Sequence, residues 1–178
     1  GKNIRRKNSS WVYILAFLFP VMIFAAGFAM KGVYPFGENS ALVVDGVHQY
    51  TAFYKELLSQ LEKGAGWTYS THSMGYDFYG LFCYYLSSPF SLLVLLFMKF
   101  MYVNVNDAVT AVILIKVGLC SVSMAWYSGK KYPGRGSMAV SLGCMYALSN
   151  FLMGYYSNVM WLDCIMLLPV LAYFIEQL

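Results

Sequence analysis

Long apolar runs dominate this chain and constrain its fold more than any other feature. Each run covers about 20 residues, the length that an α-helix needs to cross the hydrocarbon core of a bilayer. Of the 178 residues, 60% are hydrophobic and only 11% are charged, whereas a soluble domain carries about 25% charged residues. So few charges cannot cover a water-facing surface. The sequence therefore excludes a soluble enzyme, a disordered chain and a disulfide-stapled secreted domain.

The pattern within the runs favours helices over strands. Strands of a membrane β-barrel alternate in polarity, and these runs do not. The net charge of +4 is no nucleic-acid footprint, because the basic residues stand at the ends of runs and not on one face. All four cysteines lie in apolar stretches without a CxxC pair, so we interpret them as packing residues. We predict an all-α, multi-span helical protein of the cell membrane that contacts membrane lipids and no nucleic acid.

We predict four membrane spans in a single polytopic unit covering residues 1–178. The spans are residues 11–30, 108–127, 137–156 and 159–175. A basic cluster before the first span places the N-terminus in the cytoplasm, and the run is too long for a signal-peptide core. Because the chain stops directly after an apolar run, we expect it to be a fragment of a longer protein.

The segment 31–107 is predicted to be an outer loop that contains one ambiguous apolar run. The short loop 129–136 carries three basic residues and no acid, which predicts a cytoplasmic location. A full span at 80–103 would instead put this loop outside. The run contains Ser87-Ser88-Pro89, a helix-start signal, so we interpret 80–103 as a re-entrant or surface helix. A full span with a basic outer loop is the alternative.

An amphipathic helix is predicted over 48–63 in the outer loop. Its apolar residues follow helical spacing: Tyr50, Phe53, Tyr54, Leu57, Leu58 and Leu61. The opposite face is predicted to be polar and includes Glu56 and Gln60. Such a helix lies either in the membrane interface or against other parts of the protein.

Asp45, directly before that helix, is the first candidate for chemistry. A carboxylate held at the membrane surface can take a proton from an acceptor hydroxyl. The alternative is an N-cap, which satisfies backbone N–H groups. His48, three residues on, would be in reach of Asp45 if this stretch is helical. Asp77 either orients a polar substrate or metal, or is a turn residue.

Ionisable residues inside the spans form the second group of candidates. Asp163 stands about one turn into the last span, after Asn158 and Trp161. A carboxylate in an apolar run usually faces a cavity or a partner. Trp161 is either an interfacial anchor or a cavity wall. Lys116 lies in the middle of 108–127 and either snorkels or has a buried partner, such as Asp163 or a lipid phosphate. The candidates Asp45, Asp77, Asn158 and Asp163 share the predicted outer face.

Motifs for soluble nucleotide or metal chemistry are missing from the sequence. It contains no P-loop, GxGxxG, GxSxG or HExxH motif, and its two histidines have no ligand spacing. We therefore predict no metal site from these residues. If the chain is catalytic, its donor arrives within the membrane.

Three segments resemble the N-terminal part of the YfhO-type bacterial membrane proteins, within the GT-C glycosyltransferase superfamily. They are Asp45-Gly46-Val47-His48-Gln49-Tyr50, Tyr84-Tyr85-Leu86-Ser87-Ser88-Pro89-Phe90, and Asn158-Val159-Met160-Trp161-Leu162-Asp163 with Leu167-Leu168-Pro169. Their order and spacing carry the resemblance more than any one piece. It implies a GT-C-like architecture, with a first span, a long outer loop with juxtamembrane helices, and further spans.

The resemblance also implies an activity. GT-C enzymes transfer a sugar from a polyprenyl-phosphate donor on the outer face, and YfhO-type relatives are associated with teichoic acids of the cell envelope. Asp45 matches the acidic residue taken as catalytic base, and Asp163 falls near a second acidic site residue. Lys116, or a basic residue in the part of a longer protein that is missing here, would stabilise the leaving phosphate. Asp77, His48, Asn158 and Trp161 would contact substrates. No cofactor is certain, and a divalent cation is the one candidate.

Two other functions are compatible with the sequence. A transporter or flippase of lipid-linked sugars predicts polar residues deep in several spans and internal repeats, and no repeat is visible. A non-catalytic membrane scaffold would leave the three aspartates as dispersed caps and turns.

Overall fold

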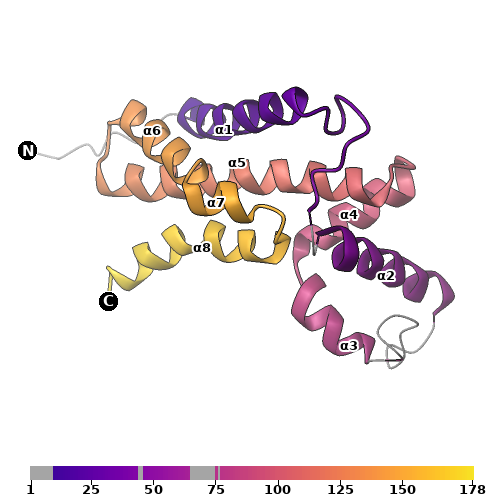
Figure 1. Ribbon diagram of the computed structural model, residues 1–178. Coiled ribbons are helices and arrows are strands. Elements are labelled where there is room, and N and C mark those ends of the chain that lie inside the picture. The colour runs from indigo at the N-terminus through magenta and orange to yellow at the C-terminus, as the bar shows by residue number, and fades with distance from the viewer. Residues whose placement is uncertain (1–9, 44–45, 65–74, 76) are drawn as a thin grey trace, which may run out of the picture. The chain divides into compact units, whose positions relative to one another are not determined.

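The computed structural model describes residues 10–43, 46–64, 75 and 77–178, and its helices are drawn in Figure 1. Apart from one bridge between Val33 and Asn39, these residues contain no β-structure. They form two compact units, and the boundary falls within one long helix. Unit 1 comprises Gly1–Met30 and Ile113–Leu178, and unit 2 comprises Lys31–Val112.

Unit 1 is a bundle of long apolar helices. It contains α1 (Ser10–Met30), most of α5 (Val105–Lys131), α6 (Gly136–Ala147), α7 (Asn150–Tyr155) and α8 (Val159–Ile175). Small side chains let the helix backbones approach closely, as is typical within membranes. The buried residues Ala16, Ala125 and Ala139 bring α1, α5 and α6 together.

The contacts of unit 1 also give the relative directions of its helices. Phe17 of α1 packs on Gly118 of α5, and Val12 contacts Gly136 at the start of α6, so α1 runs antiparallel to α5 (Figure 1). Helices α5 and α8 run parallel, because their contacts advance together along both helices. These contacts pair Cys120 with Leu162, Trp126 with Tyr173, and Lys131 with Glu176.

The outward faces of these helices are apolar. Helix α1 exposes Ile14, Leu15, Leu18, Phe19, Met22 and Ile23, and α8 exposes Leu167, Leu168, Leu171, Phe174 and Ile175. Within the described part of the chain, three helical segments are long and apolar enough to cross a membrane, namely Ser10–Met30, Val105–Lys131 and Gly136–Tyr155. Large exposed apolar surfaces of this kind mark contact with lipid or partners. The fold is therefore that of an all-α membrane protein, as the sequence predicts.

The predicted helix over 137–156 is interrupted in the structure. Helix α6 ends at Ala147, and α7 begins at Asn150 after Ser149, whose backbone is extended (φ −60°, ψ 150°). The backbone N–H of Ser149 donates to the carbonyl of Tyr146 over 3.2 Å, which closes the last turn of α6. Serine before a helix is a start signal, and here it lies inside the apolar run.

Unit 2 consists of shorter helices. In chain order they are the π-helical turn η1 (Gly46–Tyr50), α2 (Thr51–Lys63), α3 (Phe78–Leu81), the π-helical turn η2 (Phe82–Leu86) and α4 (Pro89–Phe100), followed by the first turns of α5. Helix α2 packs on η2 and α4. The rings of Tyr50 and Phe53 contact Tyr85, with centroid distances of 5.8 and 5.1 Å.

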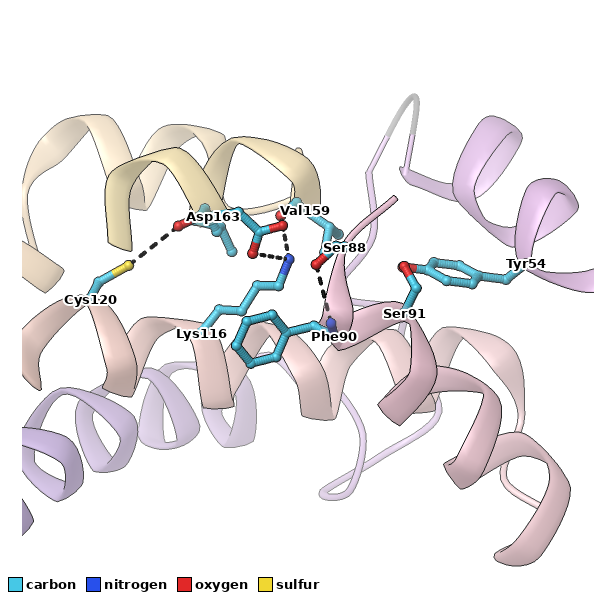
Figure 2. Close-up of polar contacts among 9 residues, drawn as sticks. Tyr54, Ser88, Phe90, Ser91, Lys116, Cys120, Val159 and Asp163 are labelled. Atoms are coloured by element: carbon cyan, nitrogen blue, oxygen red, sulfur yellow. Dashed lines mark hydrogen bonds and ion pairs between the residues drawn. The ribbon is translucent and has the colours of Figure 1, made fainter. Parts of the chain in front are cut away.

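The apolar run over 80–103 is sharply bent. Helical segments Phe78–Leu86 and Pro89–Phe100 meet at 102°. Helix α4 begins at Pro89, and the Ser88 hydroxyl accepts a hydrogen bond from the Phe90 N–H over 3.2 Å (Figure 2). The helix start predicted from Ser87-Ser88-Pro89 is thus confirmed. A broken span and a re-entrant segment both have this shape, so the membrane placement stays a prediction.

The polar face predicted for α2 is partly wrong. Glu56 and Gln60 are buried, whereas Leu61, assigned to the apolar stripe, is 52% exposed. The Gln60 amide donates to Glu56 Oε1 over 2.7 Å, and this bond offsets part of the cost of burying both groups. Nearby, the Tyr54 hydroxyl lies 3.2 Å from Ser91 Oγ of α4 (Figure 2). Helix α2 therefore presents a mixed face to its neighbours within unit 2.

Candidate functional site

A buried ion pair joins α5 to the first turn of α8 in unit 1. Lys116 Nζ lies 2.8 Å from Asp163 Oδ1 and donates a hydrogen bond to the Val159 carbonyl over 2.9 Å (Figure 2). Lys116 is 1% exposed. A lysine charge this deep is tolerated only with a partner. Of the two alternatives drawn from the sequence, the buried partner is thus the one observed.

Local helix geometry accounts for these two acceptors. Val159 and Asp163 are four residues apart, so they lie on the same face of α8. The next turn of α5 repeats the contact, because the Cys120 thiol points to the Leu162 carbonyl at 3.8 Å (Figure 2). Cys120 is fully buried and packs the two helices together. This matches the packing role predicted for Cys120, whereas Cys83 and Cys164 are exposed.

Asp163 differs from Lys116 in being partly accessible. Its Oδ1 atom is buried against the ammonium group, while the side chain as a whole remains 22% exposed. The exposed part of the side chain therefore excludes the Oδ1 atom that contacts Lys116. The ionised carboxyl group of Asp163 can accept a hydrogen bond from a second group while its ion pair with Lys116 stays intact.

Asn158 and Trp161 lie at the start of α8. Asn158 precedes the helix, and its carbonyl accepts from the Trp161 N–H over 2.9 Å. The Trp161 ring lies beside Tyr155 and Phe151, with centroid distances of 5.4 and 6.3 Å, and is 39% exposed. This half-exposed aromatic group suits either an interfacial anchor or the wall of a substrate site.

The remaining predicted residues do not belong to unit 1. Asp77 is exposed and caps α3, where its Oδ1 accepts from the Tyr79 N–H over 3.1 Å. His48 is exposed in η1. Both belong to unit 2. Asp45, the predicted base, lies outside the described residues. Among the described residues, no group of three or more His, Cys, Asp or Glu side chains is placed to hold a metal ion.

A second polar cluster was missed by sequence reasoning. At the far ends of α5 and α8, Glu176 Oε1 accepts from Lys131 Nζ over 2.6 Å and from the Tyr127 hydroxyl over 2.8 Å. These bonds hold the pKa of Glu176 below its ordinary value, first through Lys131 and then through Tyr127. The signal was available, since the predicted topology puts the ends of both spans on one side of the membrane.

Fold and site together define a multi-span helical membrane protein with a buried ion pair between two parallel helices. The family model described as "Bacterial membrane protein YfhO" matches residues 16–178. The chain therefore belongs to this family, as its sequence segments indicate. No curated protein and no solved structure matches the chain.

Proposed function

We propose that the full-length protein is a membrane glycosyltransferase. It transfers a sugar from a polyprenyl-phosphate donor to an envelope polymer, such as teichoic acid, on the outer face of the membrane. The observation that carries the proposal is the Lys116–Asp163 pair within a YfhO-family membrane protein. Ionisable residues inside a membrane are costly and mark substrate paths or reaction sites. A lipid-linked donor also fits a sequence without a nucleotide-binding motif.

The proposed reaction is an inverting substitution at the anomeric carbon of the sugar. An acceptor hydroxyl oxygen forms the new bond to this carbon as the bond to the phosphate oxygen breaks. The polyprenyl phosphate leaves with the electron pair, and Asp45 takes the hydroxyl proton. General-base help of this kind contributes on the order of 10²–10⁴ in rate. The role of Asp45 rests on its sequence position and on the family resemblance.

Within this proposal, Asp163 contacts a substrate and Lys116 positions Asp163. Lys116 already contacts two oxygen atoms and is almost fully buried. Contact with a leaving phosphate would require it to give up Asp163. We therefore propose that Lys116 holds the Asp163 carboxylate in place. Another basic group of the full-length protein stabilises the leaving phosphate. The accessible side of Asp163 then orients the acceptor or a sugar hydroxyl.

The test is transfer by full-length protein in liposomes that contain a polyprenyl-phosphate sugar, with teichoic acid added outside. We expect Asp45→Asn to lower transfer at least 100-fold, in line with loss of a general base, without changing membrane insertion. Glu62→Gln, which removes another exposed acid, serves as the matched control and keeps full activity.

Retained transfer in Asp45→Asn would overturn the assignment of the base. Movement of the lipid-linked sugar across the bilayer without a new glycosidic bond would instead support a flippase.

A double variant at the ion pair separates a structural role from a chemical one. Replacing Lys116 by Met and Asp163 by Leu removes both charges, and such apolar pairs are often tolerated. A folded but inactive double variant supports a substrate role for Asp163.

A further inference from the structure

The turn between α5 and α6 concentrates exposed positive charge at one end of unit 1. We call Lys130, Lys131, Tyr132 and Arg135 the basic turn. It is compact, since the Tyr132 N–H donates to the Ser128 carbonyl over 2.8 Å and the Arg135 N–H donates to the Tyr132 carbonyl over 3.3 Å. Gly134 makes the reversal possible with a φ of +83°, a value that favours glycine.

Only part of this charge is neutralised by the protein itself. Lys131 forms an ion pair with Glu176 at 2.6 Å. Lys130 and Arg135 are exposed, and no carboxylate in the described part of the chain pairs with either of them. Two positive charges are therefore available to an external anion.

Aromatic side chains lie beneath and beside these charges. The Lys130 ammonium group stands 5.6 Å from the centre of the Trp126 ring, and Trp126 contacts Tyr173 of α8 at 5.0 Å. Tyr132 is 45% exposed. Tryptophan and tyrosine at the ends of membrane helices favour the level of the lipid headgroups. Lys130 and Arg135 thus emerge where phosphate groups of lipids are concentrated.

We propose that the basic turn is a binding site for an anionic phospholipid, with Lys130 and Arg135 on the headgroup phosphate and Tyr132 beside the glycerol region. The position at the end of membrane-spanning helices favours a lipid over a phosphate free in solution. Each basic residue near an anionic membrane surface strengthens attraction about fivefold, so the two charges predict an enrichment on the order of tenfold or more.

Photo-crosslinking at Tyr132 tests the proposal in the full-length protein. p-Benzoylphenylalanine replaces Tyr132, and the protein is placed in nanodiscs of equimolar phosphatidylglycerol and phosphatidylcholine. Mass spectrometry then measures the ratio of the two lipid adducts. We expect about tenfold more phosphatidylglycerol adduct, and a large loss of this preference at 1 M salt, where screening acts within about 3 Å.

Substitutions of the basic residues test whether Lys130 and Arg135 cause the preference for phosphatidylglycerol. Lys130→Gln with Arg135→Gln should return the adduct ratio to about 1, while Lys31→Gln with Lys55→Gln, two exposed lysines elsewhere, should leave it unchanged. Equal adducts in the parent protein, or an unchanged preference in the Lys130/Arg135 variant, would overturn the proposal. If that variant does not fold, the salt dependence of the parent decides, because a preference that persists at 1 M salt is not electrostatic.

Discussion

The two residues of the buried ion pair are not equivalent, and their removal should have unequal costs. Asp163→Asn leaves the lysine charge in a fully buried place, for which a loss of about 3–5 kcal/mol is typical. Lys116→Met leaves a carboxylate that is 22% exposed and that water can solvate. We expect Asp163→Asn to lower the free energy of unfolding more than Lys116→Met, as measured by denaturant titration in detergent.

The double variant with Met at 116 and Leu at 163 is the control for this pair. It should be more stable than Asp163→Asn, since no charge remains buried. Equal losses in both single variants would show that water reaches Lys116 as easily as Asp163.

The Glu176 contacts predict a pH dependence at the other end of α8. Because Lys131 and Tyr127 lower its pKa, the Glu176 carboxylate stabilises the folded state at pH values above its ordinary pKa of 4.5. That stabilisation decreases as the pH falls below 4.5 and is lost once the pH passes the lowered folded-state value. Melting temperatures of the parent and of Glu176→Gln should therefore differ at pH 7 and converge as the pH falls below 4.5. A difference in melting temperature that stays constant across this pH range would exclude the Glu176 contacts as its source.

Sequence reasoning at the residue scale found charges but not their backbone partners. A lysine in the middle of an apolar run is visible in the sequence, and the need for a partner follows from the cost of burying charge. The Val159 carbonyl is not visible in this way, because every residue carries one. Its part in binding Lys116 depends on how α5 and α8 pack, which no local pattern records.

At the scale of helix elements, two buried glycines make a matched comparison. A Cβ on Gly143 would lie 2.6 Å from the Ser121 carbonyl oxygen, whereas one on Gly118 would lie 2.5 Å from the edge of the Phe17 ring. The backbone oxygen cannot move without displacing a helix, whereas the Phe17 ring can be replaced by a smaller side chain. We expect Gly143→Ala and Gly118→Ala each to cost about 1–3 kcal/mol through overpacking.

Rescue distinguishes the two glycines. Phe17→Leu should restore much of the melting temperature lost in Gly118→Ala, whereas Ser121→Gly should restore little in Gly143→Ala. Rescue of both, measured in the same detergent, would contradict the packing of α5 against α6.

Some elements could be predicted closely and others could not. Helix α8 covers Val159–Ile175, the range of the predicted last span, since the apolar run has clear ends. The interruption at Ser149 was missed because apolar residues continue on both sides of it. The burial of Glu56 and Gln60 in α2 could not be predicted, since periodicity alone does not reveal that the Gln60 amide donates to Glu56.

At the scale of the whole molecule, the helix directions within unit 1 bear on membrane topology. Helix α1 is antiparallel to α5, so the start of α1 and the basic turn lie at the same end of unit 1. Basic residues precede α1 and form the basic turn, and the positive-inside rule assigns such segments to the cytoplasm. This agreement supports a non-spanning 80–103 segment, which stays a prediction.

Labelling of single cysteines in intact cells would check this topology. In a full-length protein without other cysteines, Ser137→Cys should react with a membrane-impermeant maleimide only after permeabilisation. Ser157→Cys, in the turn before α8, should react from outside. The reverse pattern would indicate a full span at 80–103 and an outer basic turn.

The depth at which α8 begins has a consequence for the surrounding bilayer. Helix α8 starts at Val159, four residues before Asp163, which is about 6 Å along the helix axis. A carboxylate so close to a helix start lies near the boundary between hydrocarbon and headgroups in a membrane-spanning helix. Hydrated headgroups would then reach Asp163 without any opening of the helix bundle.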